Sequence, residues 1–266
     1  MPANGRKSIF ITGAASGIGR ATALLFARSG WFVGGYDRNT GGLKSLSDEI
    51  GEANIVTGPL DVTDKKAFEK ALADFAVQTE GRLDILFNNA GIGRGGPFDQ
   101  QPFEEILEVV QVNLVGVLNG IHSALPLLKA TPGSLCFTTS SSSATYGMPN
   151  IAVYSATKHA VKGLTEALSI EFRAFGVRAA DTLPGLIDTA ILPPDAAKNA
   201  PSEGMFRLTP PSAVAQAVWD AYGSDKLHWY VPPEIEDLDK AATLAPETLR
   251  EQLASGGLFN RDPGQT

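Results

Sequence analysis

Short apolar runs alternate with longer amphipathic segments along most of the chain. Runs rich in β-branched and aromatic residues, each followed by polar or glycine-rich positions, predict six or seven strands, at 8–12, 31–36, 54–60, 83–87, 134–137, 177–183 and 227–231. Segments with helical character separate them, one ending at Arg28 and others at 65–78, 103–128, 154–175, 213–222 and 246–253. Strands that alternate with helices predict an α/β fold, a doubly wound parallel sheet with helices on both faces.

Length and composition favour one domain. A chain of 266 residues with 43% hydrophobic residues can bury one sizeable core, so we expect a single domain over 1–266. The proline-rich segment at about 186–210 lacks periodicity, which is typical of a lid or substrate loop. Residues from about 232 to 266 are expected to form a largely polar C-terminal tail.

The overall charge excludes some partners. A formal net charge of −7 and a pI near 5.0 argue against nucleic acid or an anionic membrane. The single cysteine, Cys136, lies inside an apolar run, which predicts a core residue in a reducing compartment. The first residues contain no long apolar segment, and we expect no segment of membrane-spanning length. These features predict a soluble cytoplasmic protein.

Tyr154 and Lys158 form the main candidate for chemistry. They are four residues apart, so a helix would place them on one face. An ammonium beside a phenol lowers the phenol's pKa from about 10, which suits proton exchange with an alcohol or carbonyl. Ser141, thirteen positions earlier, could bind the same substrate oxygen. The alternative is a buried tyrosine and a surface lysine that share a helix by accident.

A glycine-rich turn follows the first strand. The segment from Gly13 to Gly19, including Gly17, stands between this strand and a helix. This arrangement offers free backbone N–H groups and a positive helix end to a pyrophosphate. Glycines let the backbone approach the phosphates closely, although an ordinary strand–helix loop would also contain them.

Two acidic residues end the second and third strands. Asp37 could accept hydrogen bonds from the adenosine ribose hydroxyls and would repel a 2′-phosphate. Arg38 acts in the opposite sense, because a guanidinium could pair with that phosphate. We therefore expect NAD, with NADP less favoured. Asp61 could contact the adenine amino group. Helix capping would explain either acid as well, and turn formation would explain Asp37.

Further polar residues follow other strands. Asn88–Gly91 ends the fourth strand, and Pro184–Thr189 ends the sixth. Carboxyl ends of parallel strands share one edge, where such sheets bind ligands. Asn113 interrupts a helix, either to anchor a water molecule beside Lys158 or to bond its own helix. His122 is interpreted as structural or partly exposed.

Together these motifs resemble the short-chain dehydrogenase/reductase family over residues 7–230. The matching positions are Thr12–Gly19 (T-G-x-x-x-G-x-G), Asn88–Gly91 (N-N-A-G), Asn113, Ser141, Tyr154–Lys158 (Y-x-x-x-K) and Pro184–Thr189 (P-G-x-x-x-T). The sequence also contains a control, because Tyr222 and Lys226 have the same spacing without a serine thirteen positions earlier. Only Tyr154 has the complete context.

The resemblance implies hydride transfer between a nicotinamide cofactor and an alcohol or ketone. It implies catalytic roles for Tyr154 as acid/base, Lys158 as its tuning group and ribose ligand, Ser141 as substrate-orienting group and Asn113 as holder of a relay water. The residues it implies for cofactor binding are Gly13, Ser16, Gly17, Ile18, Gly19, Asp37, Asp61, Val62, Asn89, Ala90, Gly91, Tyr154, Lys158, Pro184, Gly185, Ile187 and Thr189. A resident metal is not expected.

The resemblance leaves several points open. Ala179–Ala180 stands where the family often has Val-Asn, and the last strand leads to Pro232–Pro233 rather than to a glycine-rich segment. The expected substrate is a neutral, fairly hydrophobic secondary alcohol or ketone, because the predicted pocket wall is mostly apolar. That wall is expected to comprise Ala144–Met148, Ile191, Leu192, Met205 and Phe206.

The family also implies a homodimer or homotetramer, formed through the helices at 103–128 and 154–175. Two other functions remain alternatives: a catalytically idle nucleotide-binding or scaffolding protein of the same fold, and an enzyme acting on nucleotide-sugars. The latter class usually carries a larger C-terminal substrate domain than this chain offers.

Overall fold

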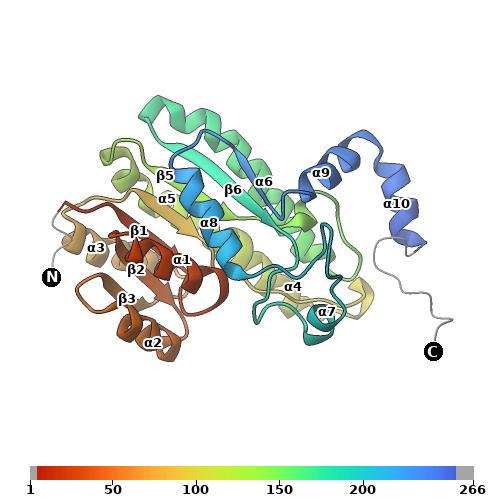
Figure 1. Ribbon diagram of the computed structural model, residues 1–266, viewed down its shortest axis with the longest axis horizontal. Helices are drawn as coiled ribbons and strands as arrows, with labels where there is room; N and C mark the ends of the chain where they lie inside the picture. The colour runs from red at the N-terminus through yellow and green to blue at the C-terminus, as the bar shows by residue number, and fades with distance from the viewer. Residues whose placement is uncertain (1–4, 256–266) are drawn as a thin grey trace.

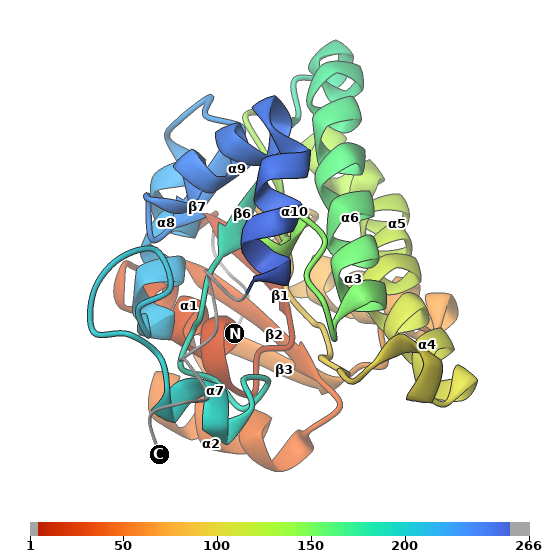
Figure 2. The same cartoon turned by 90° about the vertical axis from the view of Figure 1, so that its right-hand side faces the viewer.

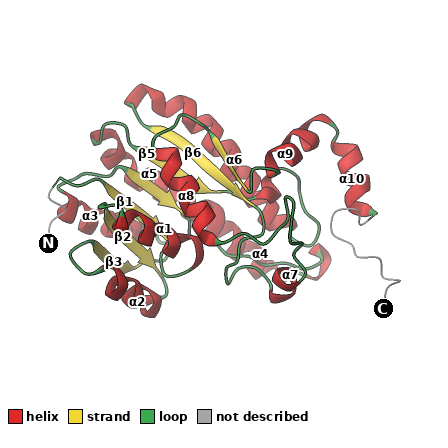
Figure 3. Ribbon diagram, in the orientation of Figure 1, coloured by secondary structure: helices red, strands yellow, loops and turns green. Residues whose placement is uncertain are grey.

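A parallel sheet forms the middle layer of the molecule, and helices cover both of its faces (Figure 1, Figure 3). The computed structural model describes residues 5–255, and this part of the chain contains seven strands. They are β1 (Ser8–Thr12), β2 (Phe32–Asp37), β3 (Ile55–Pro59), β4 (Ile85–Asn88), β5 (Leu135–Thr139), β6 (Arg178–Pro184) and β7 (His228–Val231). The principal helices are α1 (Gly17–Arg28), α2 (Thr40–Ile50), α3 (Lys65–Thr79), α4 (Phe103–Val110), α5 (Gly116–Ala130), α6 (Ala152–Glu171), α7 (Pro194–Lys198), α8 (Pro211–Tyr222), α9 (Ile235–Leu244) and α10 (Pro246–Ala254).

The strand order is β3-β2-β1-β4-β5-β6-β7, with every neighbouring pair parallel. The chain runs outward from β1 to β3 and then returns to place β4 on the other side of β1. The carboxyl ends of β1 and β4 therefore flank the point at which the strand order reverses. In open α/β sheets this point is the usual ligand crevice.

Two apolar layers stabilise the sheet, one on each face. Figure 2 shows the helices that carry them, with α3, α5 and α6 on one side of the sheet and α1 and α8 on the other. Phe68 of α3, Ile121 of α5 and Val161 of α6 belong to one layer. Phe26 of α1 and Val218 of α8 belong to the other. Because both faces are covered, β1 is buried along its whole length, which explains its nearly continuous apolar sequence.

The predicted fold class is confirmed, and each predicted strand is present with ends that differ by at most two residues. Three helices lie where no helix was expected, and one of them, α7, is within the segment expected to be a substrate loop. Helix α2 has few apolar positions and begins at the Asn39 cap, whose side chain accepts from the Gly42 N–H. Helix α9 lies in the expected polar tail, anchored by buried Ile235 and Leu238. The remainder of that tail, 256–266, lies outside the described residues.

The predicted helix at 103–128 is not uniform. Helices α4 and α5 are joined by a π-helical segment, Gln111–Val115, which contains Asn113. By length and hydropathy alone, the combined stretch Phe103–Ala130 would suffice to cross a membrane, contrary to the expectation from the sequence. Its α5 part buries Val117, Ile121 and Leu128 against the sheet, as a core helix does.

Candidate active site

Helix α6 and the end of β5 bring Tyr154, Lys158 and Ser141 together. Lys158 is buried, and its Nζ donates to the backbone oxygen of Thr139 at 2.7 Å. The same ammonium lies 5.6 Å from the centre of the Tyr154 ring. Ser141 follows β5, and its hydroxyl forms a hydrogen bond that favours the ionised form of Tyr154. The predicted one-face arrangement is confirmed, and Lys158 is buried rather than on the surface.

Burial shifts the pKa values of Tyr154 and Lys158 in opposite directions. It raises the pKa of the Tyr154 phenol, and the hydrogen bond with Ser141 only partly opposes this. Burial also lowers the pKa of the Lys158 ammonium to about 8, although the Asp181 carboxylate opposes that shift. The expectation that Lys158 lowers the pKa of Tyr154 below its ordinary value is therefore wrong for this protein in the absence of ligands. Desolvation is the larger effect here.

Asn113 has a role that neither sequence interpretation anticipated. Its side-chain amide is fully buried and pairs with the backbone of Ile92, accepting from the N–H and donating to the carbonyl, both at 2.9 Å. It therefore fixes the loop after β4 rather than bonding its own helix. A Cβ on Gly91 would lie 3.3 Å from the Asn113 oxygen and 3.8 Å from the Lys158 nitrogen. The side chains of Asn113 and Lys158 therefore both lie close to Gly91, in the loop after β4.

The glycine-rich turn is held rigidly against the end of β4. The Thr12 hydroxyl accepts from the backbone N–H groups of Asn89 and Ala90, both at 3.0 Å. The Asn89 amide donates to the carbonyls of Thr12 at 3.0 Å and Gly13 at 3.3 Å. A Cβ on Gly19 would lie 2.1 Å from the Gly13 oxygen, so only glycine fits there.

The start of α1 is suited to an anion. Ser16 is its N-cap, yet its side chain makes no capping hydrogen bond, and the first turn of the helix carries no acidic residue. Gly17 has a positive φ of 52°, and Ile18 is half-buried behind it. Backbone N–H groups of this turn therefore remain available to a phosphate, as the sequence predicts.

Asp37 and Asp61 lie at the ends of β2 and β3. Asp37 accepts from the N–H of Ala15 in the glycine-rich turn at 3.0 Å and from that of Asn39 at 2.9 Å. Asp61 accepts from the N–H and the hydroxyl of Thr63. Burial opposes ionisation of Asp61, but these hydrogen bonds and the Arg38 charge outweigh it and lower its pKa. Arg38 lies 3.9 Å from Asp61 and is mostly exposed.

Neither of these acids caps a helix. Asn39 caps α2 and Asp64 caps α3, so the capping interpretation is wrong for both. Asp37 does close a turn, as the other interpretation held, while it also holds the glycine-rich loop. Val62 is buried, and its carbonyl accepts from the Asn119 amide at 2.9 Å.

The segment after β6 reaches back to α1. The N–H of Gly185, which follows Pro184, donates to the Val231 carbonyl at 2.8 Å. Ile187 pairs with Thr209, and Thr189 lies so close to Gly17 that a Cβ there would be 2.9 Å from its methyl group. An open depression of about 540 Å³ lies between this segment and α1, and it does not reach Tyr154.

Taken together, the residues present fit a nicotinamide dinucleotide. A glycine cradle that a Cβ would fill adjoins free N–H groups, a carboxylate at the end of β2, and a buried lysine beside a tyrosine. Thr139 and Ser140 were missed, although both hold Lys158, through the Thr139 carbonyl and through a Ser140 hydroxyl that donates to the Lys158 carbonyl at 3.0 Å. The serine- and threonine-rich run 138–143 after an apolar strand was the available signal.

The predicted apolar wall is partly present. Tyr146, Met148, Met205 and Phe206 belong to one apolar cluster. This cluster also contains side chains that the prediction lacked, which are Ile151 and the helical residues Leu238, Ala242, Leu249 and Leu253. Ile191 instead is largely exposed and adjoins Gly93. His122 is exposed, in keeping with its noncatalytic interpretation.

Comparisons with known proteins agree with this geometry. The sequence profile of the short chain dehydrogenases matches residues 7–200. Cyclohexanol dehydrogenase of an Acinetobacter species is 35% identical over 219 residues, covering 80% of this chain and 86% of the relative.

Two crystal structures are also similar. The 3-ketoacyl-(acyl-carrier-protein) reductase of Brucella melitensis complexed with NADH gives a TM-score of 0.76 at 29% identity, covering 85% of this chain and 96% of that one. The alcohol dehydrogenase of Thermococcus sibiricus complexed with 5-hydroxy-NADP gives 0.73 at 27% identity, covering 84% and 94%. With its profile match extending over most of the chain, the protein belongs to the short-chain dehydrogenase family.

Proposed function

We propose that this protein is an NAD-dependent oxidoreductase that interconverts a neutral, fairly hydrophobic secondary alcohol and its ketone. The observation that carries the proposal is the convergence of Tyr154, Lys158, Ser141 and Asn113 at the carboxyl ends of β4 and β5. A partly buried phenol, a buried amine and a hydroxyl in one site can exchange a proton with a bound alcohol.

In this proposal Tyr154 is the acid/base. Its oxygen takes the hydroxyl proton when the alcohol is oxidised and returns it when the ketone is reduced. Ser141 orients the same substrate oxygen, and Lys158 binds the nicotinamide ribose while its charge favours the phenolate. Asn113 fixes the loop after β4 against the site. The bound nicotinamide supplies the hydride acceptor or donor.

The remaining proposed contacts hold the cofactor. The glycine-rich turn and the start of α1 would receive the pyrophosphate, and Asp37 the adenosine ribose. Ile187 and Thr189 would hold the carboxamide. The NAD preference is supported by the Asp37 carboxylate at the end of β2 and by Arg38 lying within ion-pair distance of Asp61. The 2′-phosphate of NADP would have to approach the Asp37 carboxylate, and it would have to draw the Arg38 guanidinium away from Asp61.

The substrate class is inferred from the apolar cluster around Met148, which includes Met205, Phe206 and Leu249. Apolar walls with few polar groups are typical of sites for hydrophobic small molecules. The alcohol named for the Acinetobacter relative is of this class.

We also propose a homodimer or homotetramer. Exposed apolar side chains lie on α4, α5, the end of α6 and the 3₁₀ turn that follows it, and they are Phe103, Leu107, Leu118, Ile170 and Phe175.

The deciding experiment is a fluorescence titration with NADH and, separately, NADPH, followed by a screen of neutral alcohols with NAD⁺. We expect tighter NADH binding and a loss of about 10- to 100-fold in Asp37→Ala, since hydrogen bonds to a carboxylate are lost. Tyr154→Phe should bind NADH normally and lose about 10²- to 10⁴-fold in turnover.

Each contrary result has a distinct meaning. Tighter NADPH binding would show that Arg38 outweighs Asp37. Unchanged turnover in Tyr154→Phe would refute the catalytic assignment and favour an idle nucleotide-binding protein of this fold. Turnover of small charged hydroxy acids without activity on neutral ketones would refute the substrate class.

A further inference from the structure

After β7 the chain continues into two helices, α9 and α10, which together are called the C-terminal hairpin (Figure 1). Because β7 ends at Val231 and α9 begins at Ile235, the hairpin starts at the carboxyl-terminal edge of the sheet, where Tyr154 and Ser141 also lie. Both helices lie beyond residue 200, where the match to the family profile ends. Membership of the family therefore does not account for the hairpin.

One face of α9 is apolar and packs on the edge of the sheet. Ile235 is fully buried, and a Cβ on Gly185, in the turn after β6, would lie 2.9 Å from its Cδ1. Leu238 and Ala242 follow at helical spacing and are buried as well. Both belong to the apolar cluster described above, together with Leu249 of α10. The hairpin therefore directs a row of apolar side chains toward the active site.

The rest of this cluster comes from two segments that flank the active site, 146–151 and 205–206. The first lies within the connection from Ser141 to Tyr154. The second belongs to the loop after β6, and the Met205 oxygen would lie 3.2 Å from the same Cβ on Gly185. The hairpin thus joins the apolar residues of both flanks into one cluster.

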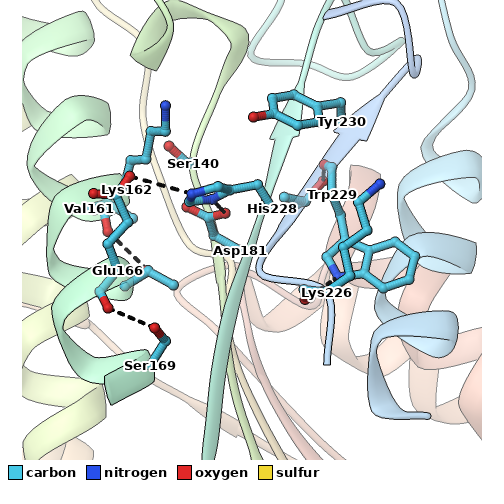
Figure 4. Close-up of polar contacts among 12 residues, drawn as sticks. Ser140, Val161, Lys162, Glu166, Ser169, Asp181, Lys226, His228, Trp229 and Tyr230 are labelled. Carbon is cyan, nitrogen blue, oxygen red and sulfur yellow. Dashed lines mark hydrogen bonds and ion pairs between the residues drawn. The ribbon is translucent and has the colours of Figure 1, made fainter. Parts of the chain in front are cut away.

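A largely buried ionic contact fixes the hairpin to the helix that carries Tyr154 and Lys158. Asp239 lies on the packed face of α9, and its side chain is 13% exposed. The Lys162 ammonium donates to both of its oxygens, at 2.8 and 2.7 Å, and the Tyr230 hydroxyl donates to one of them at 2.6 Å. Figure 4 shows the polar ends of Lys162 and Tyr230 directed toward one another from α6 and β7.

This contact connects the hairpin to the proposed catalytic groups. Lys162 lies one helical turn beyond Lys158, on the same side of α6. Glu236 of α9, in contrast, pairs with Lys240 of its own helix at 2.9 Å and fixes no other element. Hydrogen bonds between charged groups are strong and directional where water is largely excluded. Asp239 therefore sets the position of α9 relative to α6.

We propose that the C-terminal hairpin is the outer wall of the substrate site, in which Ala242 and Leu249 set the size of the apolar group accepted and Asp239 is a positioning residue that holds this wall against α6. The inference rests on the proposed function and adds where the carbon skeleton of the alcohol or ketone lies. The substrate oxygen meets Tyr154 and Ser141, and the skeleton packs on the apolar cluster. Ala242 has the smallest side chain of that cluster, so it leaves the space into which a second ring extends.

Ketone binding to the protein saturated with NAD⁺ or NADP⁺, whichever binds more tightly, tests the wall without turnover, because an oxidised nicotinamide has no hydride to donate. Calorimetry with cyclohexanone and the bicyclic ketone decalone gives the ratio of the two affinities. Ala242→Phe fills the space and should reduce the preference for decalone about tenfold, whereas Leu249→Ala opens it and should increase that preference about tenfold. Shifts in the same direction, no shift, or a wild type that binds neither ketone would overturn the proposal.

Leu244→Ala is the matched control, because Leu244 lies on α9 with its side chain 83% exposed. It should leave the affinity ratio as in wild type. An equal shift in this variant would assign the effect to general loosening of the hairpin and would refute the wall. If Ala242→Phe does not fold, Ala242→Leu gives the same test with a smaller change of volume.

Asp239→Asn tests the positioning role. We expect both ketones to bind about tenfold more weakly while NADH affinity is unchanged, because the variant leaves Lys162 without its carboxylate and the wall is no longer held. Asp239→Glu keeps a carboxylate and should recover most of the ketone affinity. A purely structural role would lower the melting temperature of Asp239→Asn and leave ketone affinity as in wild type, which would refute the positioning role.

Oxidation of cyclohexanol and decalol by the same proteins separates this inference from the proposed function. If the ketone affinities change as expected and wild type oxidises neither alcohol, the wall stands and the proposed reaction fails. If wild type oxidises the alcohols while Ala242→Phe and Leu249→Ala leave the ratio of their kcat/KM values unchanged, the reaction stands and the role of the hairpin is refuted.

Discussion

Two carboxylates are fully buried at opposite ends of the same sheet, and their surroundings differ. Asp84 directly precedes β4 at the amino-terminal edge, far from the proposed chemistry. It accepts from the Ser8 N–H at 2.9 Å, from two Arg82 nitrogens at 2.6 Å each and from the Tyr222 hydroxyl at 2.8 Å. Asp181, toward the carboxyl-terminal edge, has His228 on one oxygen, and within residues 5–255 no group forms a hydrogen bond with the other.

The difference separates a well-satisfied buried charge from a poorly satisfied one. Four hydrogen bonds neutralise Asp84 locally, and the groups that donate them tie β1, β4 and α8 together. Such a charge contributes to the fold and has little remaining effect on more distant groups. Asp181 is poorly satisfied, and burial raises its pKa even though His228 opposes this. An incompletely neutralised charge costs stability and can influence other buried groups nearby.

The largest expected effect is the loss of Asp84. Asp84→Asn removes the charge that Arg82 and Tyr222 share, so we expect the free energy of unfolding to fall by about 3–5 kcal/mol. Asp181→Asn should change it by about 1 kcal/mol or less, because the amide can still accept from His228 and no longer has a buried charge. Urea denaturation followed by tryptophan fluorescence measures both. Equal losses would remove the distinction between the two carboxylates.

The sheet and the Tyr154–Lys158 pair follow from general rules that the sequence expresses strongly. Apolar runs that alternate with helical segments predict the parallel sheet, and the spacing of Tyr154 and Lys158 places both on one face of α6. The place of Gly19 in the glycine-rich turn could be predicted, because this turn between strand and helix leaves no room for a side chain. These features depend on local geometry, and local geometry is what sequence periodicity reports.

The surroundings of Asp181 could not be predicted, because they depend on contacts between residues that are distant in sequence. Asp181 and His228 are 47 residues apart, and nothing in either neighbourhood indicates that β6 and β7 place them in register. The Asn113–Ile92 pair likewise requires a π-helical segment that periodicity does not reveal. The error about the pKa of Tyr154 has the same origin. Spacing predicts that an ammonium is near, whereas the extent of desolvation depends on the whole fold.

The next largest effect concerns Lys158 itself. Its folded-state pKa of about 8 lies below its ordinary value of 10.5, so the folded protein binds fewer protons than the unfolded chain between these pH values. The buried ammonium therefore destabilises the fold fully below pH 8, and stability rises as pH increases toward 10.5. Lys158→Met should unfold with a free energy about 2 kcal/mol higher than wild type at pH 7, after allowing for the lost bond to Thr139.

Denaturation curves at pH 7 and pH 10 distinguish this effect from better packing of methionine. The advantage of Lys158→Met should decline across this interval as the wild-type ammonium deprotonates. A constant advantage would contradict the assigned pKa shift. Cofactor binding should weaken in the same variant, so stability and function would change in opposite directions at one residue.

The smallest effect tests the histidine that orients Asp181. Burial disfavours its imidazolium, but the hydrogen bond and charge of Asp181 outweigh burial and raise the pKa of His228 above its usual 6.5. A raised pKa contributes stability that is fully present below pH 6.5 and is lost as pH rises through the folded-state value. His228→Asn removes this contribution, so its destabilisation relative to wild type should be greatest at pH 6 and diminish toward pH 8. A difference independent of pH would mean that His228 only fills space beside Asp181.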